Sequence, residues 1–141
     1  MVGLLLMLVL VASADQFSKW LVTSRCIDRD LPSRKAVPVR IRLVTNRKLP
    51  IGSAQNKHVL LALWIVLVLS IIIIAQFGPL FRSAMAQVGL GIALGGSMGN
   101  LCDILWRKGV VDFIDLRIWP LFNLADASIV AGVALALLYI Y

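Results

Sequence analysis

Four long apolar blocks, separated by polar segments, dominate the pattern of residues along this chain. Each block is close to the length of about 20 residues that an α-helix needs to cross the hydrocarbon core of a bilayer. The pattern therefore predicts a membrane all-α fold with four transmembrane helices. These helices are expected over about 1–22, 58–77, 83–103 and 122–141.

The longest polar segment, residues 23–56, follows the first block. Within it, Val39-Arg40-Ile41-Arg42-Leu43 alternates apolar and polar side chains with period two, which is typical of a half-buried strand. We therefore expect a small β-sheet on the membrane surface after the first helix. A second polar loop is expected over 104–121, and the whole chain, 1–141, is expected to form a single integral membrane domain.

The first block has an alternative interpretation as a cleavable signal peptide. Ala12-Ser13-Ala14 resembles a small-residue cleavage site, but no positively charged region precedes the apolar run. We therefore favour a first membrane helix whose polar end lies at the membrane surface.

The third block is rich in small residues, which let helices approach closely in lipid. We therefore expect the third helix to be the central one. The glycines that carry this expectation are Gly89, Gly91, Gly95, Gly96 and Gly99.

Composition and charge agree with a membrane protein. The chain is 60% hydrophobic, whereas soluble domains are about 45–50% apolar. Its net charge is +7, and all of its acidic residues are Asp. The basic residues flank the apolar blocks and form no recognisable nucleic-acid module, so lipid headgroups are the expected partners and nucleic acid is not.

Charge also bears on the orientation in the membrane. Four spans put both termini on one side and the two long loops on the other, together with every Asp. Arg82 is the one basic residue expected on the side of the termini. By the positive-inside rule alone, the side of the long loops would be cytoplasmic.

Several catalytic and metal chemistries find little support in the residues. His58 is the only His, and no other candidate catalytic or metal-binding residue lies near it in the sequence, so a zinc site, a serine–histidine pair and a cysteine protease are all disfavoured. Cys26 and Cys102 form no CxxC motif and are best interpreted as two unpaired thiols, with a disulfide left open. No cofactor or metal is expected.

Polar clusters interrupt the ends of the apolar blocks. Ionisable residues at membrane depth cost roughly 2.5–3.5 kcal/mol each on insertion scales, so they need partners or a function. Asn100 and Asp103 share one helix face, and Asn123 and Asp126 repeat the same spacing. The clusters are Asp15-Gln16-x-x-Lys19, Asn100-x-x-Asp103, Val111-Asp112-Phe113-Ile114-Asp115 and Phe122-Asn123-Leu124-Ala125-Asp126.

Paired aspartates can hydrolyse a peptide without a covalent intermediate. Two carboxylates held close do not both ionise easily, so one acts as general base on water while the other polarises the carbonyl and protonates the leaving amine. Four alternatives stay open on spacing alone. Asp103 or Asp126 could be helix N-caps, Asp15 and Lys19 could form an interfacial ion pair, and the clusters could be a polar network that joins the helices or an ion or proton path.

The order of these motifs and the residues in them resemble lipoprotein signal peptidase (signal peptidase II). The resemblance is carried by Asp15-Gln-x-x-Lys19, by Gly95-Gly96-x-x-Gly99-Asn100-x-x-Asp103, by Val110-Val111-Asp112-Phe113-Ile114-Asp115 and by Phe122-Asn123-Leu124-Ala125-Asp126. It spans nearly the whole chain, and the last two motifs are the most specific.

The resemblance implies an intramembrane aspartic endopeptidase that removes signal peptides from diacylglyceryl-modified prolipoproteins. It implies a multi-pass protein of the bacterial inner membrane, with cytoplasmic termini and with a sheet that forms a substrate cradle over an active site at the outer face. Asp112 and Asp126 would be catalytic. Substrate-binding or supporting roles would fall to Asp15, Lys19, Asn46, Gly96, Asn100, Asp103, Asn123 and Ala125.

Two departures from the family pattern support an alternative. Ile104 stands where the family has Arg, with Arg107 one turn further on, and the motif at Asn46 lacks the family's Phe. The chain could therefore be a catalytically inactive relative that serves as a structural or assembly subunit of a membrane complex. Its basic 25–57 segment would then dock an acidic protein partner. A transporter or channel is a third, weaker alternative.

Overall fold

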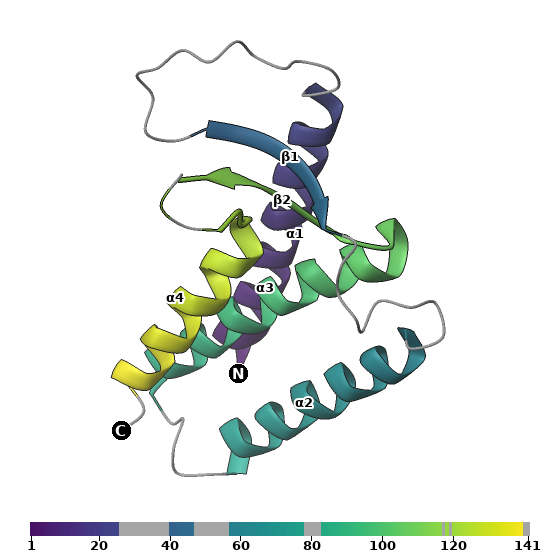
Figure 1. Ribbon diagram of the computed structural model, residues 1–141. Helices are drawn as coiled ribbons and strands as arrows, with labels where there is room; N and C mark the ends of the chain where they lie inside the picture. Colours follow the sequence, from purple (N-terminus) through teal and green to yellow (C-terminus); the bar gives the residue numbers. More distant parts are fainter. Residues whose placement is uncertain (26–39, 47–56, 78–82, 117, 119, 140–141) are drawn as a thin grey trace.

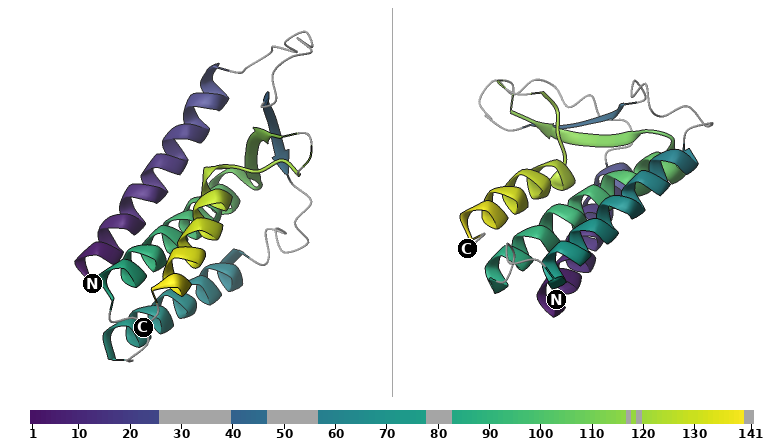
Figure 2. Two further views of the ribbon diagram at one scale, coloured as in Figure 1. Left: turned by 90° about the vertical axis from the view of Figure 1, so that its left-hand side faces the viewer. Right: turned by 90° about the horizontal axis from the view of Figure 1, so that it is seen from below.

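The computed structural model describes residues 1–25, 40–46, 57–77, 83–116, 118 and 120–139 (Figure 1). Most of these residues are helical. The elements in chain order are α1 (Val2–Arg25), β1 (Arg40–Asn46), α2 (Lys57–Phe77), α3 (Ala84–Arg107), β2 (Val110–Asp115) and α4 (Leu124–Leu138). The start of α1 and the end of α4 lie at one end of the helix bundle, and the sheet lies at the other (Figure 2).

Helix α3 is the central helix, as the small residues predicted. It packs against both α1 and α4, and its glycines permit this close approach. A Cβ atom on Gly91 would lie 2.3 Å from the Leu4 carbonyl oxygen of α1, and one on Gly96 would lie 2.4 Å from the Ala125 carbonyl oxygen of α4. Larger residues at these positions would push the helices apart.

Helix α2 makes fewer contacts with the rest of the bundle. Its Trp64 indole N–H donates a 3.0 Å hydrogen bond to the Ser97 hydroxyl of α3. Many of its large apolar side chains are exposed, among them Leu63, Val66 and Ile73. An apolar surface of this kind is typical of a helix that faces lipid rather than water.

The sheet has two antiparallel strands, one from each of the polar segments. Arg40 of β1 pairs with Asp115 of β2, and Asn46 pairs with Val110, with an irregularity between Ile41 and Val44. The expected strand over 39–43 is therefore present but begins one residue later and continues to Asn46. We had expected the sheet to lie within 23–56, whereas its second strand comes from 110–115.

The loop expected over 104–121 is largely ordered structure, so this prediction was wrong. Helix α3 continues to Arg107, because Arg107 contacts the Asp103 carboxylate one turn earlier. Lys108 then ends the helix in the left-handed conformation, with φ of 59°. The residues that follow are rich in β-branched and aromatic side chains and form β2.

The remaining helix boundaries differ from expectation by a few residues. Helix α1 extends to Arg25 rather than to about 22, and α4 spans Leu124–Leu138 within the expected 122–141. The later start of α4 follows from Asn123, which caps the helix and is itself extended.

Among the described residues, α1 and α3 are long and apolar enough to cross a membrane. The apolar parts of α2 and α4, residues 58–74 and 124–138, are shorter.

Candidate active site

Asn123 is the residue around which the site is built. It precedes α4 and caps it, because its side-chain oxygen accepts a 2.9 Å hydrogen bond from the Asp126 backbone N–H. In return, the Asp126 carboxylate accepts a 3.2 Å hydrogen bond from the Asn123 backbone N–H, which completes a capping box. Asp126 is thus held by the first turn of its own helix.

The same Asn123 holds Asp112, which lies on β2. The Asn123 Nδ2 group donates to Asp112 Oδ1 at 2.9 Å, and also contacts the Val111 carbonyl at 3.2 Å. Asn123 therefore binds a carboxylate from the strand through its side-chain amide and a carboxylate from the helix through its backbone N–H. This brings together the two aspartates that the sequence predicted.

Asp112 is 7% exposed, and its surroundings make ionisation costly. Burial is the largest cause that raises the pKa of Asp112, and the negative charge of Asp126 raises it further. The Asn123 hydrogen bond and the charge of Lys19 oppose this rise, and the resulting pKa is about 6. Asp112 is therefore suited to hold a proton that an ordinary aspartate would lose.

Asn100 of α3 is the second residue that donates a hydrogen bond to the Asp126 carboxylate. Its Nδ2 group donates to Asp126 Oδ1 at 2.8 Å. Its own side-chain oxygen accepts from Asn123 Nδ2 at 3.2 Å and from the Lys19 ammonium at 3.1 Å. Two donors on this oxygen fix the orientation of the amide, so that its NH₂ group must face Asp126.

Beneath Asn100 lies an ion cluster that is completely buried. The Lys19 ammonium lies 2.7 Å from Asp15 Oδ2 and 2.8 Å from Asp103 Oδ2, and all three side chains are 0% exposed. Together with Asn100, these acceptors use all three ammonium hydrogens. The expected pair of Asp15 and Lys19 is therefore present, but it is buried inside the bundle, whereas we expected it at the membrane interface.

Asp15 also links α1 to the start of α4. Its Oδ1 atom accepts a 2.9 Å hydrogen bond from the Ala125 backbone N–H, a donor that has no partner within the first turn of the helix. Gly99 makes room for this carboxylate, because a Cβ atom there would lie 2.3 Å from Asp15 Oδ2. The predicted supporting roles of Asp15 and Ala125 thus correspond to one contact.

Asp103 links the cluster to β2. Its Oδ2 atom accepts a 3.1 Å hydrogen bond from the Val111 backbone N–H, next to Asp112. Asp103 is an interior residue of α3, so the N-cap alternative does not hold for it. For Asp126 that alternative holds in part, because its carboxylate belongs to the capping box of α4.

Two residues of the site were not among the predicted ones. Gln16 Nε2 donates to the Gly99 carbonyl at 2.9 Å and to Asp103 Oδ1 at 3.2 Å. Arg107 donates to Gln16 Oε1 at 2.8 Å and pairs with Asp103. Arg107 already stood out in the sequence as the residue, one turn further on, that could substitute for the family's Arg, and its spacing of four residues from Asp103 was the signal.

The other predicted residues have different positions. Gly96 lies below the site and sets the contact between α3 and α4. Asn46 ends β1 opposite Val110, and its side chain lies outside the described part of the structure. Cys26 lies outside it too, and Cys102 is buried in α3.

In the described part of the chain, the site is fully hydrogen-bonded. Every buried side-chain nitrogen or oxygen there has a partner. No group of three or more His, Cys, Asp or Glu side chains among these residues could hold a metal ion. The groups that the described site offers are carboxylates and amides, together with the charges of Lys19 and Arg107.

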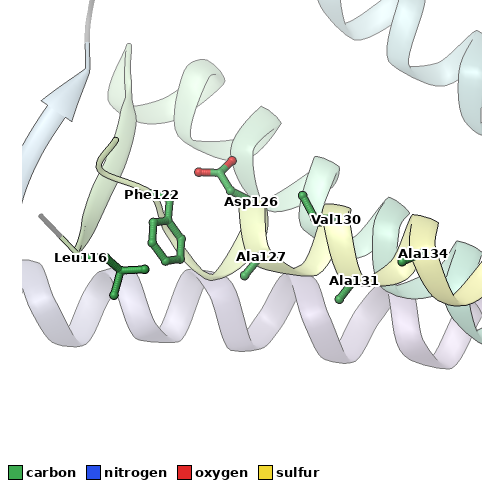
Figure 3. Close-up of a pocket in the computed structure, with 7 residues that line it drawn as sticks. All are labelled: Leu116, Phe122, Asp126, Ala127, Val130, Ala131 and Ala134. Atoms are coloured by element: carbon green, nitrogen blue, oxygen red, sulfur yellow. The ribbon is translucent and has the colours of Figure 1, made fainter. Parts of the chain in front are cut away.

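An apolar groove adjoins the site along α4 (Figure 3). Its volume is about 390 Å³, and among the described residues that line it Asp126 is the charged one. Small side chains on α4 leave the space, while Phe122 and Leu116 border one end (Figure 3). The lining residues are Leu116, Phe122, Asp126, Ala127, Val130, Ala131 and Ala134.

Known proteins resemble this chain over most of its length. A family model described as "Signal peptidase (SPase) II" matches residues 7–141. The lipoprotein signal peptidase of Halothermothrix orenii is 34% identical over 137 residues, covering 96% of this chain and 93% of the relative. That of Moorella thermoacetica is 38% identical over 135 residues, covering 92% and 86%.

Two solved structures of bacterial membrane enzymes have the same fold. Their TM-scores are 0.74 and 0.77. Each match covers 98% of this chain, and the matches cover 87% and 92% of the two solved chains. Their sequences are 23% and 24% identical to this one.

Proposed function

This chain belongs to the signal peptidase II family, and from this premise we propose that it is an aspartic endopeptidase that removes signal peptides from lipid-modified prolipoproteins. The resemblance drawn from the motifs is thereby confirmed at the level of the family. The single observation that supports the chemistry best is that Asn123 donates hydrogen bonds to the carboxylates of both Asp112 and Asp126.

Asp112 and Asp126 act as the catalytic pair in this proposal. Asp112 holds the proton in the active form, because its pKa of about 6 keeps a fraction of the molecules protonated near neutral pH. Asp126 is the general base, and the donors from Asn100 and Asn123 suit its ionised form. No covalent intermediate and no cofactor are required.

The reaction then proceeds in two proton-balanced steps. Asp126 takes a proton from a water molecule whose oxygen attacks the scissile carbonyl carbon, while Asp112 donates a hydrogen bond to the carbonyl oxygen. When the tetrahedral intermediate collapses, the C–N bond breaks and a carboxyl proton passes to the leaving amine. That proton is the one that Asp126 took from the water, so the pair returns to its starting state with Asp112 protonated and Asp126 ionised.

The catalytically inactive alternative is not favoured. A subunit that served only in assembly would not need two carboxylates held close in a buried site at a cost in stability. The absence of Arg at position 104 does not leave Asp103 without a cation, because Arg107 and Lys19 both contact it.

We further propose that all four helices span the bacterial inner membrane as one domain over 1–141. Exposed large apolar side chains on α2 and α4, such as Leu67 and Leu137, support lipid contact for the two helices with shorter apolar parts. The site and the sheet then lie at the outer face, and the termini are cytoplasmic. The sheet would act as a cradle that holds the scissile segment extended.

The groove along α4 would receive the apolar part of the substrate that adjoins the scissile bond. Apart from Asp126, its lining in the described part of the chain is apolar, which suits the apolar part of a lipid-modified precursor. Membrane lipids contact the exposed helix faces. The basic 25–57 segment, most of which lies outside the described residues, would bind anionic headgroups or an acidic protein partner.

Cleavage of a defined precursor tests the proposed activity. The purified protein in detergent should shorten a diacylglyceryl-modified prolipoprotein at the modified Cys, and should leave the same precursor intact when that Cys is replaced by Ser before lipidation. Mass spectrometry of the products locates the cut. Failure to cleave the modified precursor, with the protein folded, would favour the structural alternative.

An alkaline phosphatase fusion tests the proposed orientation. The enzyme is active only outside the cytoplasm, so a fusion within the segment near residue 35 should be active and one after the last residue should be inactive. The reverse pattern would restore the orientation that the positive-inside rule favours, because Arg82 is the one basic residue on the side of the termini.

A further inference from the structure

Arg107 occupies an unusual position at the end of α3. Its side chain is 31% exposed, whereas the Asp103 carboxylate that it contacts is 0% exposed. It also donates to Gln16 Oε1 of α1 at 2.8 Å. The guanidinium therefore lies at the boundary between the buried ion cluster and the surroundings, and it joins α1 to α3.

Arg107 balances the charge of that cluster. Asp15 and Asp103 contribute two negative charges, and Lys19 contributes one positive charge between them. Without Arg107, the buried groups would carry one uncompensated negative charge, which is costly in a medium of low dielectric constant. Asp103 is the carboxylate that would carry it, because Lys19 is shared with Asp15.

Asp103 in turn sets the path of the strand that carries Asp112. One of its oxygens, Oδ1, faces Arg107, while the other, Oδ2, accepts the Val111 backbone N–H at 3.1 Å. With Oδ1 fixed by Arg107, the carboxylate plane is fixed as well, and Oδ2 points at β2. We propose that Arg107 is a positioning residue that orients the Asp103 carboxylate and thereby places Asp112 in the catalytic pair. This inference rests on the proposed function.

Loss of Arg107 should also alter the titration of Asp112. The charged groups near Asp112 are Lys19 of α1, Asp103 of α3 and Asp126 of α4; β1 carries Arg40 and Arg42, whose side chains lie outside the described part. The charge of Asp103 already raises the pKa of Asp112, and removal of Arg107 would leave that charge less balanced. The pKa of Asp112 would then rise further.

Three variants test the proposal in the full-length protein. Arg107→Gln removes the charge, Arg107→Lys keeps it, and Lys108→Asn removes the neighbouring exposed charge while keeping a residue that tolerates the left-handed conformation. For Arg107→Gln, kcat should fall by up to about 100-fold, the loss that a misplacement of about 1 Å produces, with little change in KM. The pH profile of kcat should shift to higher pH.

The controls separate positioning from a general effect of charge. Arg107→Lys should recover part of the lost kcat and most of the pH profile, and Lys108→Asn should match the wild type. Equal losses in Arg107→Gln and Lys108→Asn, or an unchanged pH profile with an unchanged kcat, would overturn the inference while the proposed function stood. A wild type that does not cleave would overturn both. Thermal melting of each variant in detergent identifies any loss that is due only to unfolding.

Discussion

Asp112→Asn should reduce cleavage of the lipid-modified precursor by roughly 10²- to 10⁴-fold, the contribution typical of a general acid or base, and Asp126→Asn should do the same. Asn has nearly the same shape as Asp but cannot donate or accept the catalytic proton at neutral pH. Asp112 would lose its acid, and Asp126 would lose its base. The single-turnover cleavage rate at saturating enzyme measures the effect on chemistry.

Asp115→Asn is the matched control for this prediction. Asp115 ends the same strand, three residues beyond Asp112, and takes no part in the contacts with Asn123 described above. Asp115 is half-buried but lies outside the hydrogen bonds that hold Asp112 and Asp126, so its replacement should reduce the cleavage rate far less than Asp112→Asn does. Substantial residual cleavage in Asp112→Asn or Asp126→Asn would remove that residue from the catalytic pair.

The same Asp112→Asn variant should be more stable than the wild type at neutral pH. The pKa of Asp112 is about 6 in the folded protein and 3.8 ordinarily, so the folded state binds the proton more tightly than the unfolded state does. The contribution of Asp112 to the free energy of unfolding is therefore fully present below about pH 4, and it is lost as the pH rises through about 6. Two units of pKa correspond to about 3 kcal/mol at most, because one unit is 1.36 kcal/mol.

Thermal melting in detergent at a series of pH values measures this difference. Asn carries no charge at any of these values, so the two proteins should melt alike near pH 4 and diverge by pH 7, with the variant higher. A variant that melts lower at pH 7 would show that the Asp112 carboxylate stabilises the fold. A gain in stability together with lost cleavage would mark Asp112 as a residue kept for chemistry rather than for folding.

The sequence predicted the helices and the pair of aspartates for different reasons. The helices were visible because their apolar blocks have the length of a membrane span, a property of composition alone. Asp112 and Asp126 were visible through a family resemblance, since spacing alone left a polar network and an ion path open. The structure shows that the network alternative was also partly right, because the same side chains that hold the pair join α1, α3 and α4.

What the sequence could not predict depends on contacts between distant segments. The partner of β1 is β2, about 70 residues later, and no local pattern connects Asn46 with Val110. The burial of Lys19 likewise could not be predicted, because a spacing of four residues from Asp15 fits an ion pair at the membrane interface equally well. Asp103, which comes from another helix, is what turns that pair into a buried cluster.

Lys19→Met should be the most destabilising of the substitutions considered, at about 3–5 kcal/mol, the usual cost of removing one partner from a buried ion pair. Met fills a similar volume but leaves Asp15 with no cation and Asp103 with Arg107 alone. It also removes the Lys19 ammonium, one of the two donors that orient the Asn100 amide. Cleavage should therefore fall even under conditions in which the variant is folded.

Denaturant titration in detergent, with Lys108→Met as the control for loss of an exposed charge, measures the destabilisation. The double variant Lys19→Met with Asp15→Asn should be more stable than Lys19→Met alone, because it also removes the uncompensated charge that the single variant leaves in the bundle. That recovery distinguishes a charge effect from a packing effect, since a poorly fitting Met would cost the same in both backgrounds. Recovery of stability without recovery of cleavage would show that Lys19 stabilises the fold and also orients Asn100 toward the catalytic pair. A Lys19→Met variant as stable as the Lys108→Met control would contradict the buried cluster itself.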